Sequence, residues 1–308
     1  MARENYTIVM EFILLGFSVG PKFQVILFVV FLIIYMNILM GNGLIIAITK
    51  TDPTLQTPMY FFLGNFSFLE ICYTSVILPN LLINFWSHNK SISFLDCAVQ
   101  LCFFLILGST ECFLLAVMAY DRYVAICNPL NYPLIMNHKF CTQLVVVSWI
   151  SGIPISIVLT YQVFSLSFCG SNKLNHVFCD IPPLLKLACG DTITTEFSVY
   201  ILAVLFGMVS FLLILWSYIK IITLILKLPS ATGRRKAFST CFSHFIVVSL
   251  FYGSIAIMYL SPKTSHSEEN DKVLSLFYTI LTPMFNPIIY SLRNKDVIAA
   301  LRKILVKN

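Results

Sequence analysis

The stretch CAVQLCFFLILGSTECFLLAVMAY, residues 97–120, lies between Asp96 and Asp121 and contains one charged residue, Glu111. An α-helix needs about 20 apolar residues to cross the hydrocarbon layer of a membrane, which is roughly 30 Å thick. Residues 97–120 are long enough to cross that layer, and Arg122 follows at their end. This stretch therefore predicts a membrane-spanning helix.

Six further stretches are long and carry at most one Asp, Glu, Lys or Arg. The chain of 308 residues is 58% hydrophobic and 11% charged, and one water-soluble core could not bury so much apolar surface. We therefore expect an all-α membrane protein, a bundle of seven transmembrane helices in a single domain. The helices are expected at residues 23–49, 57–85, 97–125, 140–163, 196–226, 237–261 and 272–292.

The distribution of Lys and Arg predicts the orientation of the chain. Basic residues collect near Lys50, Arg122 and Lys139, between the fifth and sixth helices, and in the C-terminal tail. Because basic residues are retained on the cytoplasmic side, the N-terminus is expected outside the cell, in a multi-pass protein of the plasma membrane. The basic inner face suits anionic lipid and an acidic protein partner, whereas short loops at the membrane border do not suit nucleic acid.

Three segments lie outside the predicted helices. Residues 1–22 form an outer tail that does not resemble a removable signal peptide, and Asn5-Tyr6-Thr7 within it predicts glycosylation at Asn5. Residues 164–195 form a long outer loop, and long structured loops often carry function. Residues 293–308 form an inner tail, in which 296–306 is expected to be a short amphipathic helix on the membrane surface.

Four cysteines are expected on the oxidising outer side: Cys97 at the start of the third helix and Cys169, Cys179 and Cys189 in the long loop. They allow three pairings, and their spacing alone does not select one. The segment from His176 to Asp180 also contains metal-binding side chains. A disulfide at Cys179 would remove the thiolate from such a site.

Five motifs, in order and at matching depths, carry a resemblance that covers nearly the whole chain. They are Leu55–Leu63 (LQTPMYFFL), Met118–Cys127 (MAYDRYVAIC), Ser217–Tyr218, Lys236–Cys241 (KAFSTC) and Pro283–Tyr290 (PMFNPIIY). The chain resembles an odorant receptor, of the tetrapod-type class II within the rhodopsin-like superfamily of G-protein-coupled receptors. Gln56 departs from the histidine that is usual in this family. The resemblance implies that Cys97 pairs with Cys179 and that Cys169 pairs with Cys189.

The resemblance assigns the inner ends of the helices to a G-protein switch. Its members would be Asp121, Arg122, Tyr123, Tyr218 and Tyr290. Arg122 lies 25 residues after Cys97, about 38 Å along a helix, and therefore reaches the inner rim. An arginine at that depth needs a partner, and the adjacent Asp121 is the nearest candidate. Pro287 removes a backbone hydrogen bond and permits a bend in the seventh helix.

Two acids lie inside the membrane at similar depth, because Glu70 is 11 residues from Met59 and Glu111 is 11 residues from Arg122. Two buried like charges cannot both stay bare, so one carboxyl is protonated or the two share a cation. The resemblance implies a sodium pocket completed by Asn42 and Asn286. A neutral hydrogen-bonded pair is the alternative, and no other cofactor is expected.

The ligand is expected in the outer half of the bundle, about 10 to 18 Å below Cys97. No Asp, Glu, Lys or Arg occurs in this ring, and an unpaired buried ligand charge would cost several kcal/mol. A small, mostly neutral volatile such as an alcohol, aldehyde, ketone or ester therefore fits. The predicted ring consists of Phe104, Leu105, Gly108, Ser109, Leu202, Ala203, Phe206, Tyr252, Ile255, Ala256, Tyr259 and Thr279.

Other functional classes fit the sequence less well. A retinal pigment needs a lysine within the seventh helix, and residues 273–292 contain none. We find no internal repeats of the kind that transporters show, and no enzyme motif. The resemblance implies a receptor that couples a small odorant to a stimulatory G protein and cyclic AMP. A chemosensory receptor for an endogenous small molecule is the alternative.

Overall fold

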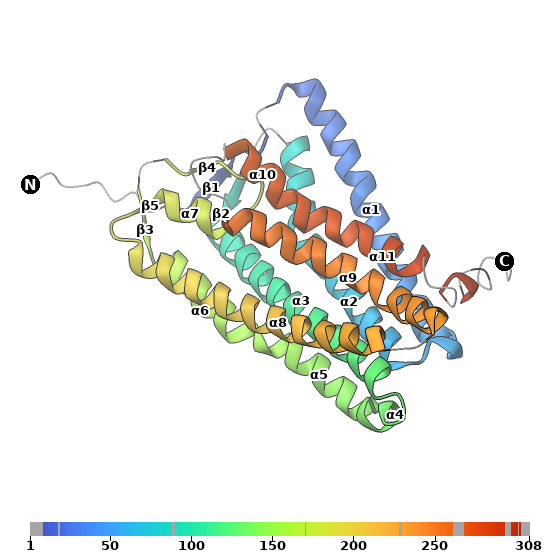
Figure 1. Cartoon of the computed structure of the whole chain (residues 1–308). Helices are drawn as coiled ribbons and strands as arrows, with labels where there is room; N and C mark the ends of the chain where they lie inside the picture. The colour runs from blue at the N-terminus through green and yellow to red at the C-terminus, as the bar shows by residue number, and fades with distance from the viewer. Residues whose placement is uncertain are drawn as a thin grey trace, which may run out of the picture.

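A computed structural model describes residues 9–17, 19–87, 90–169, 171–227, 230–260, 268–292, 297–300 and 302. Within them, the side chains at 231–233, 235–237, 239, 240, 255, 257–260, 268, 271, 278 and 290–292 lie outside the description. The described residues form a bundle of seven helical spans (Figure 1). Six are long and apolar enough to cross a membrane, and the sixth span contains a shorter apolar helix at Cys241–Ser254. The predicted fold class is thereby confirmed.

The spans follow the predicted stretches closely. Two of them are interrupted helices: the fourth is built from α5 and α6, and the seventh from α10, the π-helical turn η2 and α11. The sixth begins at Ala231 rather than at residue 237. In chain order the spans are α1 (Pro21–Thr51), α2 (Pro58–Trp86), α3 (Phe94–Cys127), α5 (His138–Ser151), α6 (Ile153–Phe164), α8 (Ile193–Lys227), α9 (Ala231–Leu260), α10 (Glu268–Leu276), η2 (Phe277–Leu281) and α11 (Thr282–Leu292).

The shorter elements gather at the two ends of the bundle. The strands and α7 (Ile181–Leu187) lie at the end that we call outer, following the predicted orientation (Figure 1). The opposite, inner end carries η1 (Pro53–Leu55) and α4 (Tyr132–Ile135). The inner tail is helical at residues 297–300 and 302, with Val297 and Ala300 buried. The rest of the predicted helix at 296–306 lies outside the described residues.

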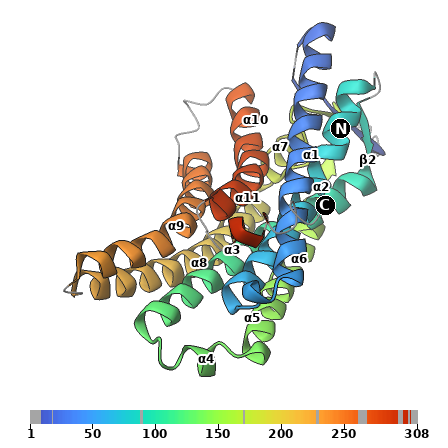
Figure 2. The same cartoon turned by 90° about the vertical axis from the view of Figure 1, so that its right-hand side faces the viewer.

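Helix α3 is the central element of the bundle. The Ser93 hydroxyl caps its first turn by accepting from the backbone N–H of Asp96 at 3.0 Å. The helix is packed against α2, α5, α6, α8 and α9, and α8 and α9 lie together on one side of it (Figure 2). Because α3 crosses the whole bundle, its residues reach both the predicted ligand ring and the predicted switch.

The fourth span is interrupted at Gly152, where α5 ends and α6 begins. A Cβ at this position would overlap the hydroxyl of Ser109 on α3, so the two helices approach closely here. Pro154 then follows in the first turn of α6, where its missing N–H removes no helical hydrogen bond. The glycine and the proline together explain why the predicted helix at 140–163 is two helices.

The N-terminal segment contains a β-strand that is not predicted from the sequence. Strand β1 (Glu11–Leu14) pairs antiparallel with β2 (Ser91–Ser93) and parallel with β4 (Lys173–Leu174). Its alternation buries Phe12 and Leu14, and the ring of Phe12 contacts that of Phe168 at a centroid distance of 5.3 Å. Residues 11–14 of the predicted outer tail thus contribute the middle strand of a sheet.

The long loop is held on the same sheet and within itself. It contributes β4 to the sheet, and its strands β3 (Ser167–Phe168) and β5 (Ala188–Cys189) pair with each other. The buried amino group of Lys272 on α10 donates to the carbonyl oxygen of Gly16 at 2.8 Å and to Glu269 at 2.7 Å. The seventh span is thus joined to the N-terminal segment at the outer end.

Candidate functional site

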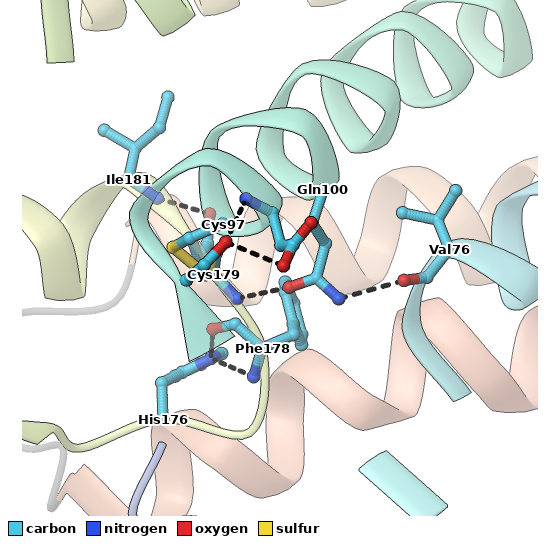
Figure 3. The surroundings of a disulfide bond; sticks show 10 residues. Val76, Cys97, Gln100, His176, Phe178, Cys179 and Ile181 are labelled. Atoms are coloured by element: carbon cyan, nitrogen blue, oxygen red, sulfur yellow. Dashed lines mark hydrogen bonds between the residues drawn. A yellow bond between two sulfur atoms is a disulfide. The ribbon is translucent and has the colours of Figure 1, made fainter. Parts of the chain in front are cut away.

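Two disulfides close the outer end of the bundle. One joins Cys97 at the start of α3 to Cys179, and the other joins Cys169 to Cys189 across the β3–β5 pair. These bonds join the cysteines that the resemblance pairs. Figure 3 shows that the first bond brings the long loop directly onto α3. The loop residues before Cys179 are thereby placed above the predicted ligand ring.

The aromatic ring of Phe104 is enclosed between two others. It stacks on Tyr73 of α2 at a centroid distance of 5.5 Å and meets Phe178 of the long loop at 5.2 Å. All three side chains are buried, and Phe104 keeps 9% of its surface exposed. Phe104 belongs to the ring predicted from the sequence, whereas Tyr73 and Phe178 do not. Nothing in the sequence of the apolar helix α2 marks Tyr73 as a ring residue. Phe178, by contrast, could have been predicted from its position next to Cys179.

Three further predicted ring members follow Phe104 on α3, and they face different neighbours. A Cβ on Gly108 would lie 3.9 Å from the ring of Tyr73, so this position faces α2. Ser109 packs instead against Gly152 at the α5–α6 junction, and its hydroxyl donates to the carbonyl oxygen of Ile106 at 2.8 Å. This orientation weighs against Ser109 as a ligand anchor. Leu105 is partly buried against the core.

Helix α8 supplies the opposite side of the ring. Ala203 and Phe206 precede the buried Ser210 by seven and four residues and therefore share its face. Phe206 is partly buried and meets Phe113 of α3 at a centroid distance of 5.6 Å. Leu202 is also partly buried, and Ala203 is exposed.

Helix α9 approaches α8 at the floor of the ring. The hydroxyls of Tyr252 and Ser210 lie 2.7 Å apart, and the Ser210 hydroxyl also reaches the carbonyl oxygens of Phe206 and Gly207. If Ser210 donates to its own helix, Tyr252 donates to Ser210, so this contact joins α9 to α8. Ala256 is partly buried one turn further along. The side chains of Ile255 and Tyr259 lie outside the described residues.

The described ring residues carry no charge. Thr279 of η2 is buried and donates to the carbonyl oxygen of Ser275 at 2.7 Å, so its hydroxyl is bound to its own helix. Tyr252, Ser109 and Thr279 are the hydroxyl-bearing members of the described ring. This arrangement suits an uncharged molecule that makes few hydrogen bonds, because a charged one would find no counter-ion among these residues.

Below the ring, α2, α3 and α11 bring together the two buried acids. Nδ2 of Asn286 donates to Oε1 of Glu70 at 2.5 Å, and Glu111 is buried nearby. Nδ2 of Asn42 donates to the carbonyl oxygen of Pro283 at 3.3 Å. Three buried oxygens here have no hydrogen-bond partner among the described residues: Oε2 of Glu70, Oδ1 of Asn42 and Oδ1 of Asn286. Oxygen atoms of this kind could coordinate a hard cation, or the two acids could share a proton.

At the inner end, Arg122 and Asp121 have different partners. Nη1 of Arg122 donates to the sulfur of Met59 on α2 at 2.6 Å. Asp121 instead accepts from the hydroxyl of Tyr132 on α4 at 2.8 Å. Burial and the carboxylate of Asp121 raise the pKa of Tyr132, which keeps this phenol protonated. Arg122 and the adjacent Asp121 therefore make their hydrogen bonds to other residues, because neighbours in a helix point in different directions, although their charges still interact.

The remaining switch residues lie where α8, α9 and α3 converge. The hydroxyl of Tyr218 lies 2.7 Å from Nδ1 of His244 on α9, and both side chains are buried. The ring of Tyr123 meets Trp216 of α8 at a centroid distance of 4.9 Å. His244 is thus a buried packing residue with a hydrogen bond to Tyr218. The side chain of Tyr290 lies outside the described residues.

The segment from His176 to Asp180 does not assemble a metal site. Cys179 is in a disulfide, and Nδ1 of His176 lies 3.0 Å from the carbonyl oxygen of Phe178. Asp180 caps α7 by accepting from the backbone N–H of Ile181 at 2.8 Å. Burial raises the pKa of Asp180, and His176 opposes this shift. The described residues contain no group of three His, Cys, Asp or Glu that could hold a metal ion.

Comparisons with known proteins agree on one family. A family described as "Olfactory receptor" matches residues 31–308. Human Olfactory receptor 10AG1 is 59% identical over 97% of this chain and 99% of its own length. Human Olfactory receptor 10A7 is 52% identical over 100% of this chain and 97% of its own length. The crystal structure of squid rhodopsin superposes with a TM-score of 0.72 at 18% identity, covering 93% of this chain and 86% of rhodopsin.

Proposed function

The chain belongs to the olfactory receptor family, and on this premise we propose that it binds a small, neutral, volatile molecule and activates a stimulatory G protein. The ligand lies in the outer half of the bundle, between α3, α8, α9 and the seventh span. The observation that carries the ligand class is the uncharged ring below the disulfide to Cys179. The aromatic pair of Phe104 and Phe178 supplies its apolar wall.

The ring is expected to discriminate against charged ligands of the same size. An amine or carboxylate would lose its hydration in the ring without gaining a counter-ion, at a cost of several kcal/mol. In cells that report cyclic AMP, we expect straight-chain alcohols, aldehydes or ketones to be active. The amine and acid of equal carbon number should be weaker by about a hundredfold or more. A panel in which amines are the stronger agonists would contradict this ring assignment.

The inner end has features that suit a G-protein partner. Leu130, just before α4, and Leu134, within α4, expose 95% and 76% of their surface, and exposed apolar side chains of this size are suited to a partner's pocket. Basic residues border the same end, in keeping with an acidic partner and with anionic lipid. The stimulatory type of G protein, with cyclic AMP as its product, is the coupling that we propose.

The proposed location is the plasma membrane, with the N-terminus outside the cell. The excess of Lys and Arg at the inner end supports this orientation, as do the disulfides at the outer end, since disulfides persist in oxidising compartments. Asn5 would then be glycosylated on the outer surface. It lies outside the described residues.

The acids Glu70 and Glu111 are proposed to hold a sodium ion or to share a proton. A sodium ion would be held by the oxygens of Glu70, Glu111, Asn42 and Asn286, three of which supply the unpartnered atoms described above. Such an ion would stabilise this arrangement of α2, α3 and α11. A tenfold excess over the dissociation constant is worth about 1.4 kcal/mol.

The two alternatives differ in their response to salt and pH. If sodium binds, purified receptor should melt roughly 2 to 5 °C higher in sodium chloride than in choline chloride of equal strength. Glu70→Gln should remove that difference, and the exposed Glu196→Gln should retain it. If the acids share a proton, melting should respond to pH and be the same in both salts. A melting temperature that changes with neither the cation nor the pH would contradict both versions.

A further inference from the structure

Gln100 of α3 lies at the junction of three segments. Its side chain is 4% exposed, and both of its polar atoms are bound (Figure 3). Oε1 accepts from the backbone N–H of Cys179 in the long loop at 3.0 Å. Nε2 donates to the carbonyl oxygen of Val76 on α2 at 2.9 Å. One side chain on α3 thereby connects the loop to α2.

The bond to Cys179 fixes the peptide group that follows Phe178. On its other side, His176 contacts the carbonyl oxygen of Phe178 through Nδ1 at 3.0 Å, and its ring meets that of Phe178 at 4.8 Å. The backbone N–H of Gly16 donates to the carbonyl oxygen of His176 at 3.2 Å. The peptide group after Phe178 is therefore held at both its N–H and its carbonyl oxygen, and the side chain of Phe178 is fully buried.

The disulfide alone does not determine where Phe178 points. A bond between the sulfurs of Cys97 and Cys179 restrains one side chain and leaves the peptide groups around it free to rotate. Gln100 binds the peptide itself, and its second bond to Val76 prevents its own side chain from turning away. The direction of Phe178 toward Phe104 follows from these backbone contacts.

We propose that Gln100 is a positioning residue that holds Phe178 over the ligand ring, and that Phe178 limits the length of the ligand. The inference rests on the proposed function, since it concerns the same ring. The ring of Phe178 meets that of Phe104 at a tilt of 46°, while Tyr73 stacks on Phe104. Removing the Phe178 ring opens the volume of a phenyl group at the outer boundary of the site, where a longer chain can extend.

The positioning role is tested without any ligand, by hydrogen–deuterium exchange of the purified receptor. Gln100→Met has a similar shape and removes both hydrogen bonds, so exchange at the Cys179 amide should quicken by about tenfold. Gln100→Glu keeps an acceptor oxygen for Cys179 but loses the donor to Val76, so exchange should fall between that of wild type and Gln100→Met. The control Gln143→Met, at an exposed position on α5, should leave that amide unchanged.

The size limit is tested with straight-chain aldehydes of about five to twelve carbons, in cells that report cyclic AMP with responses scaled to surface receptor. Phe178→Ala should extend the response to longer aldehydes and change the rank order of the series. Phe178→Leu should do so to a smaller extent, and it serves if the alanine variant fails to reach the surface. The control Phe103→Ala removes a half-exposed ring from α3, next to Phe104, and should keep the wild-type rank order.

The two arms separate the inference from the function on which it rests. Unchanged exchange at Cys179 in Gln100→Met would overturn the positioning role. Two outcomes would overturn the size limit: an unchanged rank order of aldehydes in both Phe178 variants, or no response to any aldehyde in the series. Faster exchange in a receptor that never raises cyclic AMP would support the positioning role and contradict the proposed function.

Discussion

Replacing Arg122 with alanine is expected to abolish agonist-driven cyclic AMP while ligand binding stays within a few-fold of wild type. Arg122 lies 18 residues after Phe104, about 27 Å along α3, so its loss leaves the ligand ring intact. At the inner end, its guanidinium provides a fixed fork of donors that no other residue type supplies. Cyclic AMP and radioligand or fluorescence binding should be measured on cells with matched surface receptor.

Two further variants sharpen this test. Arg122→Lys keeps the charge and loses the fork, so it should recover only part of the signal. Lys50→Ala removes an exposed basic side chain from the inner end of α1 and should signal normally. If Arg122→Ala reached the surface and lost binding and signalling equally, the separation of ligand site and switch would be contradicted.

The spans could be predicted because lipid imposes one strong rule. A helix between Asp96 and Asp121 must be long and apolar to cross a membrane, and so must its six counterparts. The interruption at Gly152 was not predicted, since it depends on the approach of Ser109 from another helix. Strand β1 was missed for a similar reason: a four-residue strand is too short to signal itself, and its partners lie in distant loops.

For the candidate site, the sequence predicts how far along each helix a residue lies but not which neighbouring helix its side chain faces. Counting residues along α3 puts Phe104, Gly108 and Ser109 within two turns of one another, and all three lie in α3. Counting does not show that Ser109 faces α5 and α6, or that Tyr73 and Phe178 both contact Phe104. α3 is apolar on several sides, so hydrophobic periodicity does not separate its lipid-facing and ring-facing surfaces. The partner of Arg122 was missed because Met59 has no charge to suggest it.

Loss of the bond between Cys97 and Cys179 is expected to remove most receptor from the cell surface. The two cysteines are separated by 82 positions in the sequence, and a cross-link over a loop of that size is worth roughly 4 to 5 kcal/mol. That amount is a large part of the stability of an ordinary protein. The bond also anchors the segment that places Phe178 on Phe104, so surviving receptor should respond weakly to its agonists.

Cys97→Ser, Cys179→Ser and the double variant should therefore show the same loss in surface staining, because each removes the same bond. Cys169→Ser opens a loop with a separation of 20, worth roughly 3 kcal/mol, and should reduce surface receptor less. Cys102→Ala changes a free cysteine on α3 and should resemble wild type. Peptide mapping without reduction identifies the bonded pairs. A link from Cys97 to Cys169 or Cys189, or a double variant that is much worse than either single one, would show that the loop is held differently.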